Sequence, residues 1–280
     1  MSSSVNFSIF NDGNEGIENR LRERFARIVE ANQEAFDGQR VLDIAANNGR
    51  WTYAALASGA KFVQSIEGRE DRVADAVKFL TSQGFEGRFN AATGDLFDFL
   101  YEARPGDFDT VLCLGIYYHV MDHYHLLKLM TRLEPEVVLI DSGFVRSFRN
   151  SVHVQMEDPS KHLNALEVFE NQSAEPVGFV SLGLMLQMAW NVGYSCRPVI
   201  WDPSEIGHPD DVHDYLLGRR FTLRLNRMSG HHDPDWQEYW RPALAALKPD
   251  FVGLLDRSTH DAQMDARVRQ AIKNTEFSVI

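Results

Sequence analysis

The chain has 280 residues and a formal net charge of −12, with 44% hydrophobic and 24% charged residues. This composition is typical of a globular protein with a substantial core, and its negative charge disfavours a nucleic-acid partner because phosphate backbones are repelled. The polar start of the chain and the lack of a long apolar run in the sequence favour a cytoplasmic protein with no membrane segment. Cys113 and Cys196 lie far apart, so neither a disulfide framework nor a metal site is expected.

Hydrophobic periodicity predicts an N-terminal helix followed by alternating strands and helices. Helical spacing of apolar residues covers 17–36, 51–60, 69–84, 97–104 and 122–135. Strand patterns cover 40–45, 61–68, 87–96, 108–115 and 136–142. Strands that alternate with helices at this pitch form a parallel sheet with helices on both faces, so an α/β fold is predicted.

The regular alternation stops after residue 145. Residues 146–180 are polar and mixed, with no clear period, and are predicted to form a cap insert. A helix over 181–194 follows, and then two strands, 195–202 and 219–227, have no helix between them. This pattern predicts an antiparallel hairpin at one sheet edge.

Three segments follow from this order of elements. A helical segment covers 1–37, one domain covers 38–227, and a helical tail covers 228–280. The tail is expected to serve as a lid or, together with the N-terminal helix, as a contact in a homodimer.

The carboxyl ends of the predicted strands carry the residues most relevant to function, because ligands of open parallel sheets bind there. The first strand leads through Asp43 to a short turn at Gly49, whose backbone N–H groups suit an anionic ligand. Glu67 ends the second strand, where an acid binds both hydroxyls of a ribose. Asp95 follows the third strand, where a carboxylate accepts from an adenine amino group, although capping of the next helix explains this acid equally well. The ordered set predicts an adenosine-containing ligand.

Four segments at these strand ends resemble the cofactor motifs of the class I S-adenosylmethionine-dependent methyltransferases: "VLDIAANNGRW", "QSIEGRE", "TGDLFD" and "FDTVLCLGIYYHV". The resemblance covers residues 38–145 and the hairpin 195–227. It implies a Rossmann-like seven-stranded sheet whose last strand is inserted antiparallel, with S-adenosylmethionine as the cofactor.

Carried over by position, the resemblance implies a cofactor site in four parts. These parts are Asp43 with the turn Ala45, Asn47 and Gly49 for the methionine, Glu67 with Gly68 for the ribose, Asp95 with Leu96 for the adenine, and Cys113 to Gly115 beneath the sulfonium.

The turn departs from the family pattern, because two of its usual three glycines are Ala45 and Asn47. Alanine replaces glycine where the backbone dihedrals are ordinary, and asparagine tolerates positive φ better than most residues. The turn is therefore predicted to bind the cofactor with an altered lining.

The segment "GIYYHVMDHYHLL" carries a Tyr-His pair similar to that of a methyltransferase branch with small-molecule enzymes and tRNA wobble-uridine modifying enzymes. The resemblance implies that Tyr117, Tyr118 and His119 lie beside the transferring methyl group. Because imidazole titrates near neutral pH, His119 is a candidate general base; a histidine that only holds the loop is an equally weighted alternative. His123 and His125 are two residues apart on a predicted helix, so they point in different directions and do not share a metal ion.

The leading prediction is an enzyme that transfers a methyl group in line from S-adenosylmethionine to a small-molecule metabolite. Tyr117 and His119 are its candidate catalytic residues, and the candidate substrate contacts are Tyr118, His123, Phe144 and Arg146. One alternative is a tRNA wobble-uridine modifying enzyme of the same fold, and another is a catalytically inactive, cofactor-binding partner subunit. A nicotinamide-dependent oxidoreductase is a third, against which the sparse glycines and the last hairpin argue.

Overall fold

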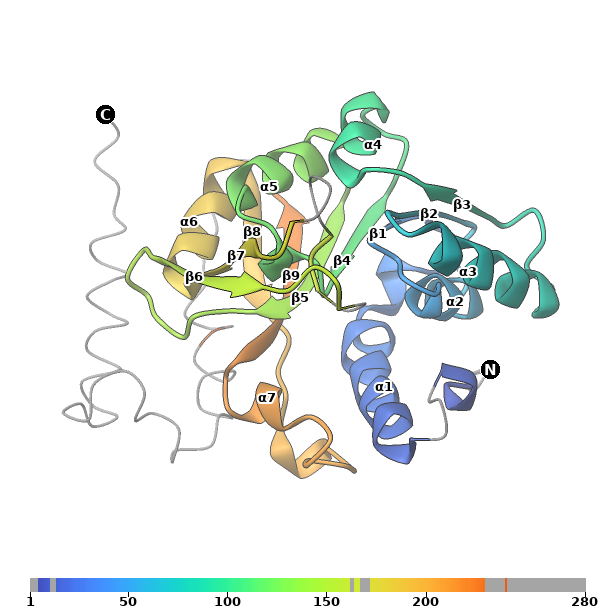
Figure 1. Ribbon diagram of the computed structural model, residues 1–280, viewed down its shortest axis with the longest axis horizontal. Helices are drawn as coiled ribbons and strands as arrows, with labels where there is room; N and C mark the ends of the chain where they lie inside the picture. Colours follow the sequence, from blue (N-terminus) through green and yellow to red (C-terminus); the bar gives the residue numbers. More distant parts are fainter. Residues whose placement is uncertain (1–4, 11–13, 162–163, 167–171, 230–239, 241–280) are drawn as a thin grey trace.

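The computed structural model describes residues 5–10, 14–161, 164–166, 172–229 and 240 (Figure 1). They form a seven-stranded sheet in the order β3-β2-β1-β4-β5-β9-β8 and a separate two-stranded sheet, β6-β7. The strands of the large sheet are β1 (Arg40–Ile44), β2 (Phe62–Glu67), β3 (Phe89–Thr93), β4 (Thr110–Leu114), β5 (Val137–Gly143), β8 (Tyr194–Pro198) and β9 (Arg220–Arg227). The first five run parallel, and β9 is antiparallel to both β5 and β8. The predicted α/β fold with an antiparallel last hairpin is confirmed.

Helices cover both faces of the sheet and enclose two hydrophobic cores. One core lies under α1 (Glu15–Ile28), α2 (Arg50–Ala57) and α3 (Glu70–Ser82). The other lies under α4 (Leu96–Glu102), α5 (His123–Arg132) and α6 (Leu182–Asn191). In Figure 1, α4 and α5 lie above the sheet and α1 lies below it. All five residues of β4 are buried, because this strand is covered by helices on both faces.

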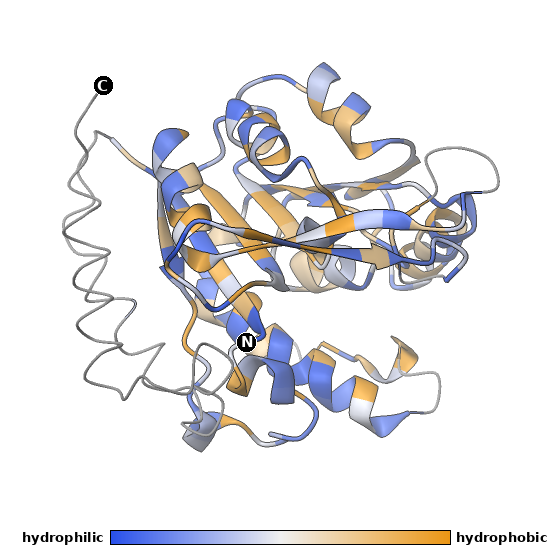
Figure 2. Cartoon of the chain, turned by 60° about the vertical axis from the view of Figure 1, so that its left-hand side comes forward, coloured by the Kyte–Doolittle hydropathy of each residue, from blue (hydrophilic) through white to orange (hydrophobic). Residues whose placement is uncertain are grey.

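The hydropathy of each element follows this layering. The sheet strands in the middle of Figure 2 are largely orange, whereas α1 is mostly blue with a few orange positions. Those apolar positions include Leu21 and Ile28, which pack into the core, while its charged residues form ion pairs such as Arg22–Glu18. The helix is thus amphipathic, as its sequence spacing predicts.

The first helix is shorter than predicted. It ends at Ile28, and residues Glu30–Ala35 continue as a 3₁₀ helix with a kink at Asn32. The Asn32 side chain donates to the carbonyls of Arg27 and Ile28, at 3.1 and 3.0 Å. This side chain satisfies two carbonyls at the end of α1. Residues Glu30–Ala35 remain helical in the 3₁₀ form, so the predicted helix extends beyond α1.

The insert has regular structure that was not predicted from the sequence. Its strands β6 (Val152–Glu157) and β7 (Glu175–Val180) pair antiparallel. One face of β6 carries Val152, Val154 and Met156, a period-2 pattern typical of a strand, yet all three are exposed. No clear period was found in 146–180 and no strands were predicted there, whereas the structure contains these two.

The hairpin strands β8 and β9 are joined by a long loop that contains the short helix α7 (His213–Leu216). Of the predicted tail, only Met228, Ser229 and Trp240 lie within the described residues. Trp240 is buried and donates from Nε1 to the Cys196 carbonyl on β8, at 3.1 Å. The domain boundaries and the role of the tail stay predictions.

No helix within the described ranges has both the length and the apolar character needed to cross a membrane.

Candidate active site

The ends of four adjacent parallel strands form one row in the order β3-β2-β1-β4. Backbone hydrogen bonds join neighbouring ends: Ala46 N to Ile66 O at 3.0 Å, and Gly94 N to Glu67 O at 3.0 Å. The fold therefore brings the predicted cofactor residues together at the carboxyl ends of the parallel strands, as the order of the elements in the sequence indicated.

The turn after β1 is strained at two non-glycine positions. Ala45 has φ 52° and Asn47 has φ 50°, so both occupy the left-handed region. The expectation that Ala45 stands at ordinary dihedrals was wrong, whereas Asn47 does adopt positive φ. A left-handed alanine costs roughly 1–2 kcal/mol relative to ordinary backbone, so this turn keeps the glycine-type path at an energetic cost.

Gly49 is required at the end of the turn. It has φ 76° and precedes the first residue of α2, and a Cβ atom there would lie 2.9 Å from the Ala76 Cβ of α3. The turn thus approaches α3 too closely for any side chain at this position.

Glu67 is the acid that links two strand ends. Its Oε2 accepts from the backbone N–H of Asn47 at 2.8 Å, and its Oε1 accepts from that of Arg69 at 3.1 Å. The Arg69 guanidinium adds an ion pair at 3.6 Å. Glu67 is buried, so its carboxylate is held in a fixed orientation between the carboxyl ends of β1 and β2.

Gly68, next to Glu67, lies beneath a side chain of the insert. A Cβ atom on Gly68 would lie 2.4 Å from the Leu166 Cδ1. The segment 164–166 of the insert therefore reaches the end of β2.

Asp43 lies inside the site, with 1% of its surface exposed. Its Oδ2 accepts from the Thr52 hydroxyl at 2.7 Å, and that hydroxyl also bonds Ser65 at 2.7 Å. Burial, opposed by the Thr52 hydrogen bonds and reinforced by the Glu67 charge, raises the pKa of Asp43 to about 7. This carboxyl group therefore titrates in the neutral range.

Asp95 is exposed and caps α4. Its Oδ1 accepts from the backbone N–H groups of Phe97 at 2.7 Å and Asp98 at 3.1 Å. Leu96 is the first residue of that helix. The capping alternative raised from the sequence is thus present, and the adenine-binding role of both residues stays a prediction.

The end of β4 forms the floor beside the turn. Cys113 is fully buried, and burial, with the charges of Asp141 and Asp43, raises the pKa of its thiol. Gly115 has φ 102° and donates to the Asp141 carbonyl at 2.8 Å. The backbone here therefore turns away from the sheet directly after β4.

His119 lies at the end of a single 3₁₀ turn, Tyr117–His119, that follows β4. Its Nδ1 lies 2.7 Å from the Glu157 Oε2 at the end of β6, and its ring lies 4.0 Å from that of Tyr118. Burial lowers the pKa of His119, Glu157 opposes this effect, and the charges of Arg220 and Arg69 add to it. The imidazole is therefore neutral at pH 7, as a general base must be.

Three other predicted residues lie in the core. Tyr117 is fully buried and donates to the His123 carbonyl at 3.1 Å, while the His123 ring bonds the Gly178 carbonyl through Nε2 at 2.7 Å. Phe144 packs 6.3 Å from the Tyr117 ring. The structure does not bring Tyr117, His123 or Phe144 to the surface beside His119, and Arg146, the first residue of the insert, is half-buried.

Two residues near His119 were not predicted from the sequence, and both come from distant parts of the chain. Glu157 is contributed by the insert, and Arg220 begins β9, with its guanidinium carbon 5.8 Å from the centre of the Tyr118 ring. The Arg220 Nε donates to the Asp141 Oδ1 at 2.6 Å, so the arginine is fixed by the end of β5. The only sequence signal for Glu157 is its place at the end of the alternating segment "VHVQME".

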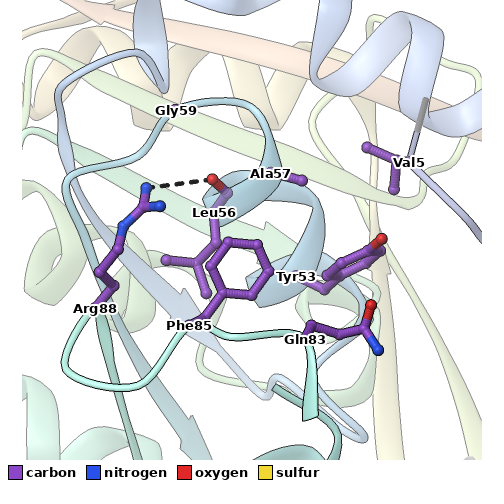
Figure 3. Close-up of a pocket in the computed structure, with 8 residues that line it drawn as sticks. All are labelled: Val5, Tyr53, Leu56, Ala57, Gly59, Gln83, Phe85 and Arg88. Carbon is purple, nitrogen blue, oxygen red and sulfur yellow. Dashed lines mark hydrogen bonds between the residues drawn. The ribbon is translucent and has the colours of Figure 1, made fainter. Parts of the chain in front are cut away.

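A cavity of about 390 Å³ lies elsewhere (Figure 3). Its lining includes Tyr53, Leu56, Gly59, Phe85 and Arg88. Gly59 and Arg88 precede β2 and β3. The cavity therefore lies at the amino ends of the strands, opposite the carboxyl ends that carry the predicted site. None of the predicted site residues lines it.

Within the described ranges, no group of three or more His, Cys, Asp and Glu side chains is arranged to hold a metal ion. His125 stacks on Phe97 and bonds the Tyr101 hydroxyl at 2.6 Å, whereas His123 is buried under β7. These two histidines therefore point apart, as predicted.

The fold is that of the class I S-adenosylmethionine-dependent methyltransferases. The N-terminal domain of EvdMO1, crystallised in the presence of SAH and D-fucose, is 22% identical with a TM-score of 0.55, and the match covers 75% of this chain and 82% of that one. An S-adenosylmethionine dependent methyltransferase from Mesorhizobium loti is 16% identical with a TM-score of 0.52, over 77% of this chain and 99% of that one. No family model matches the chain.

One curated protein is also similar in sequence. A tRNA U34 carboxymethyltransferase of Methylococcus capsulatus is 34% identical over 105 residues, which cover 36% of this chain. The match spans about a third, 32%, of that relative's length.

Proposed function

We propose that this chain is a methyltransferase that uses S-adenosylmethionine, acts on a small-molecule metabolite and employs His119 as its general base. The observation that carries the proposal is the Glu67 carboxylate, held by two backbone N–H groups at the junction of β1 and β2. A neutral His119 lies after β4, the next strand in the row.

The residues at the strand ends fit the parts of this cofactor. A carboxylate has about four lone-pair directions, and backbone N–H groups occupy two on Glu67, which leaves capacity for two ribose hydroxyls. Asp43 suits the methionine ammonium group, and the half-exposed end of β3 with Asp95 and Leu96 suits the adenine edge. When bound, the cofactor supplies a methyl group on a positively charged sulfur.

The protein then has to align the acceptor and remove its proton. Alignment of reacting atoms in a fixed geometry supplies much of the rate increase in such transfers. His119, neutral because its pKa is lowered, accepts the proton of the acceptor hydroxyl, amine or activated carbon. General-base catalysis of this kind typically contributes 10²–10⁴-fold.

The net charge of −12 supports a small molecule over a polyanion. A second candidate is a tRNA-modifying enzyme, which the 34% identity over 105 residues to a tRNA U34 carboxymethyltransferase favours. Incubation with isotopically labelled S-adenosylmethionine and either total tRNA or a low-molecular-weight metabolite fraction separates the two. Label in tRNA alone overturns the small-molecule assignment.

Calorimetric titration with S-adenosylhomocysteine tests the cofactor. We expect micromolar binding to wild type and binding weakened by about a hundredfold or more in Glu67→Ala, since two charge-assisted hydrogen bonds are lost. Glu70→Ala, an exposed acid in the first turn of α3, is the matched control and is expected to bind as wild type does. Binding of NAD(H) in place of S-adenosylhomocysteine would overturn the proposal.

A further inference from the structure

The contact between the insert and His119 is a partly buried acid–imidazole pair. The Glu157 Oε2 lies 2.7 Å from the His119 Nδ1, and the two side chains are 18% and 9% exposed. The same oxygen accepts from the backbone N–H of Ala165 at 3.1 Å. Glu157 is therefore held by two contacts to the same carboxylate oxygen, one from the His119 ring and one from the backbone.

We propose that Glu157 is a positioning residue that fixes the tautomer and orientation of His119, so that the cap insert completes the proton-accepting group of the site. This inference rests on the proposed function and names the second residue of its base. A carboxylate only accepts hydrogen bonds, so the Nδ1 of His119 must carry the hydrogen. The lone pair then lies on Nε2, which becomes the proton-accepting atom.

The charges that face His119 give Glu157 a second role. Arg220 from β9 and Arg69, which precedes α3, both disfavour a protonated imidazole, and the Tyr118 ring lies beside it, tilted by 37°. Glu157 is the carboxylate among these neighbours that favours the protonated form. During transfer the acceptor forms a bond to the methyl carbon, the bond from that carbon to sulfur breaks, and the acceptor proton passes to His119 Nε2. Glu157 stabilises the resulting imidazolium ion against the two arginines.

The insert also links this pair to the ribose-binding end of β2. Ala165, which donates to Glu157, is followed by Leu166 over Gly68. One residue earlier, the Asn164 carbonyl accepts from the Arg69 guanidinium at 2.9 Å. The segment 164–166 therefore contacts both the acid that holds His119 and the arginine that pairs with Glu67.

The test uses the full chain with ¹⁵N-labelled histidine, and Glu157→Gln removes the charge while it keeps the size of the side chain. NMR reports the tautomer and the pKa of the His119 ring, and a His119→Asn sample assigns its signals. We expect wild type to hold the hydrogen on Nδ1 and Glu157→Gln to lose that preference, with the His119 pKa lowered further because the carboxylate charge is removed. Glu175→Gln changes the acid directly opposite Glu157 on β7 and is the matched control.

Binding of S-adenosylhomocysteine and turnover separate this inference from the proposed function. We expect Glu157→Gln to bind S-adenosylhomocysteine within twofold of wild type and to lose about tenfold or more in turnover on the acceptor fraction active with wild type. If the variant keeps wild-type tautomer and turnover, the positioning role is overturned. If wild type binds no S-adenosylhomocysteine, the methyltransferase assignment fails and the catalytic role of Glu157 fails with it, whatever the NMR shows of the pair itself.

Discussion

Replacement of Asp141 by asparagine is expected to cost about 3–5 kcal/mol of folding free energy, because it leaves two buried arginines without a counter-charge. Asp141 lies at the end of β5 with none of its surface exposed. It accepts from the Arg24 guanidinium at 3.0 Å and from the Arg220 Nε at 2.6 Å. The hydroxyls of Tyr215 and Thr222 each donate at 2.7 Å, and Thr222 lies directly opposite on β9.

The pH dependence of the free energy of unfolding is a second, independent test of the role of Asp141. Burial alone raises the pKa of Asp141, but Arg24 and Arg220 hold it well below its usual range. A lowered pKa in the folded state contributes stability that is present above the unfolded value of about 3.9 and is lost as the pH falls below it. Wild type should therefore lose more stability between pH 5 and pH 3 than Asp141→Asn does.

Urea unfolding followed by tryptophan fluorescence measures both effects. The control is Asp214→Asn, because Asp214 pairs with Arg20 at 2.7 Å while about a third of its side chain, 33%, is exposed. Asp214 accepts two hydrogen bonds from Arg20, at 2.7 Å each, and a partly exposed pair of this kind contributes about 1 kcal/mol, so this variant should lose much less stability than Asp141→Asn. Equal losses in the two variants, or parallel pH curves for wild type and Asp141→Asn, would refute the reasoning.

Two further predictions concern the turn after β1. Ala45→Gly should raise the free energy of unfolding by about 1 kcal/mol because Ala45 has φ 52°, whereas Ala46→Gly next to it should lower it by about 0.5–1 kcal/mol; urea midpoints measure both, and the same sign for the pair would contradict the assignment of strain. Because the pKa of Asp43 is raised to about 7, its carboxyl group is mostly protonated at pH 6 and mostly ionised at pH 8. A cationic ammonium group beside it favours the ionised form. S-adenosylhomocysteine should therefore bind about tenfold more tightly at pH 8 than at pH 6, and calorimetry that finds equal affinities would place the ammonium away from Asp43.

The sheet was predictable because its signals are local. The apolar strand "TVLCL" is buried over its whole length, and the absence of a helical pattern between 195 and 227 indicated the antiparallel β9. The first follows from the burial of a strand in a doubly covered sheet, and the second from the helical crossover that parallel neighbours require. The order of the strand ends then followed from the fold class, which is why the sequence places Asp43 and Glu67 near the ends of neighbouring strands, as the structure does, while their roles toward the cofactor stay predictions.

The residues beside His119 were less predictable, for a geometric reason. Tyr117, Tyr118 and His119 form one 3₁₀ turn, in which successive side chains are about 120° apart. The three side chains therefore cannot all face the same site. Tyr117 is the one that packs into the hydrophobic core. The sequence places the three together but does not say which of them turns inward.

The partners of His119 were hidden by their distance along the chain. Glu157 is 38 residues away and reaches His119 only because β6 pairs with β7, which lies against the turn that carries the histidine. The alternation of Val152, Val154 and Met156 is a strand signal in the sequence, but it does not indicate which strand β6 pairs with or which residue Glu157 contacts. Such contacts depend on tertiary structure and have no periodic signal of their own.

The division of the site between sheet and insert bears on what determines the acceptor. The residues proposed to bind the cofactor lie at the ends of β1 to β4. The carboxylate beside His119 comes instead from the insert, which also covers the end of β2 through Leu166. Under the proposed function the acceptor lies between the methyl group and His119, so we expect its shape and charge to depend on Glu157 and the insert, together with Arg220 at the start of β9. Fold alone does not set the substrate, and differences in acceptor are therefore expected to follow differences in the insert.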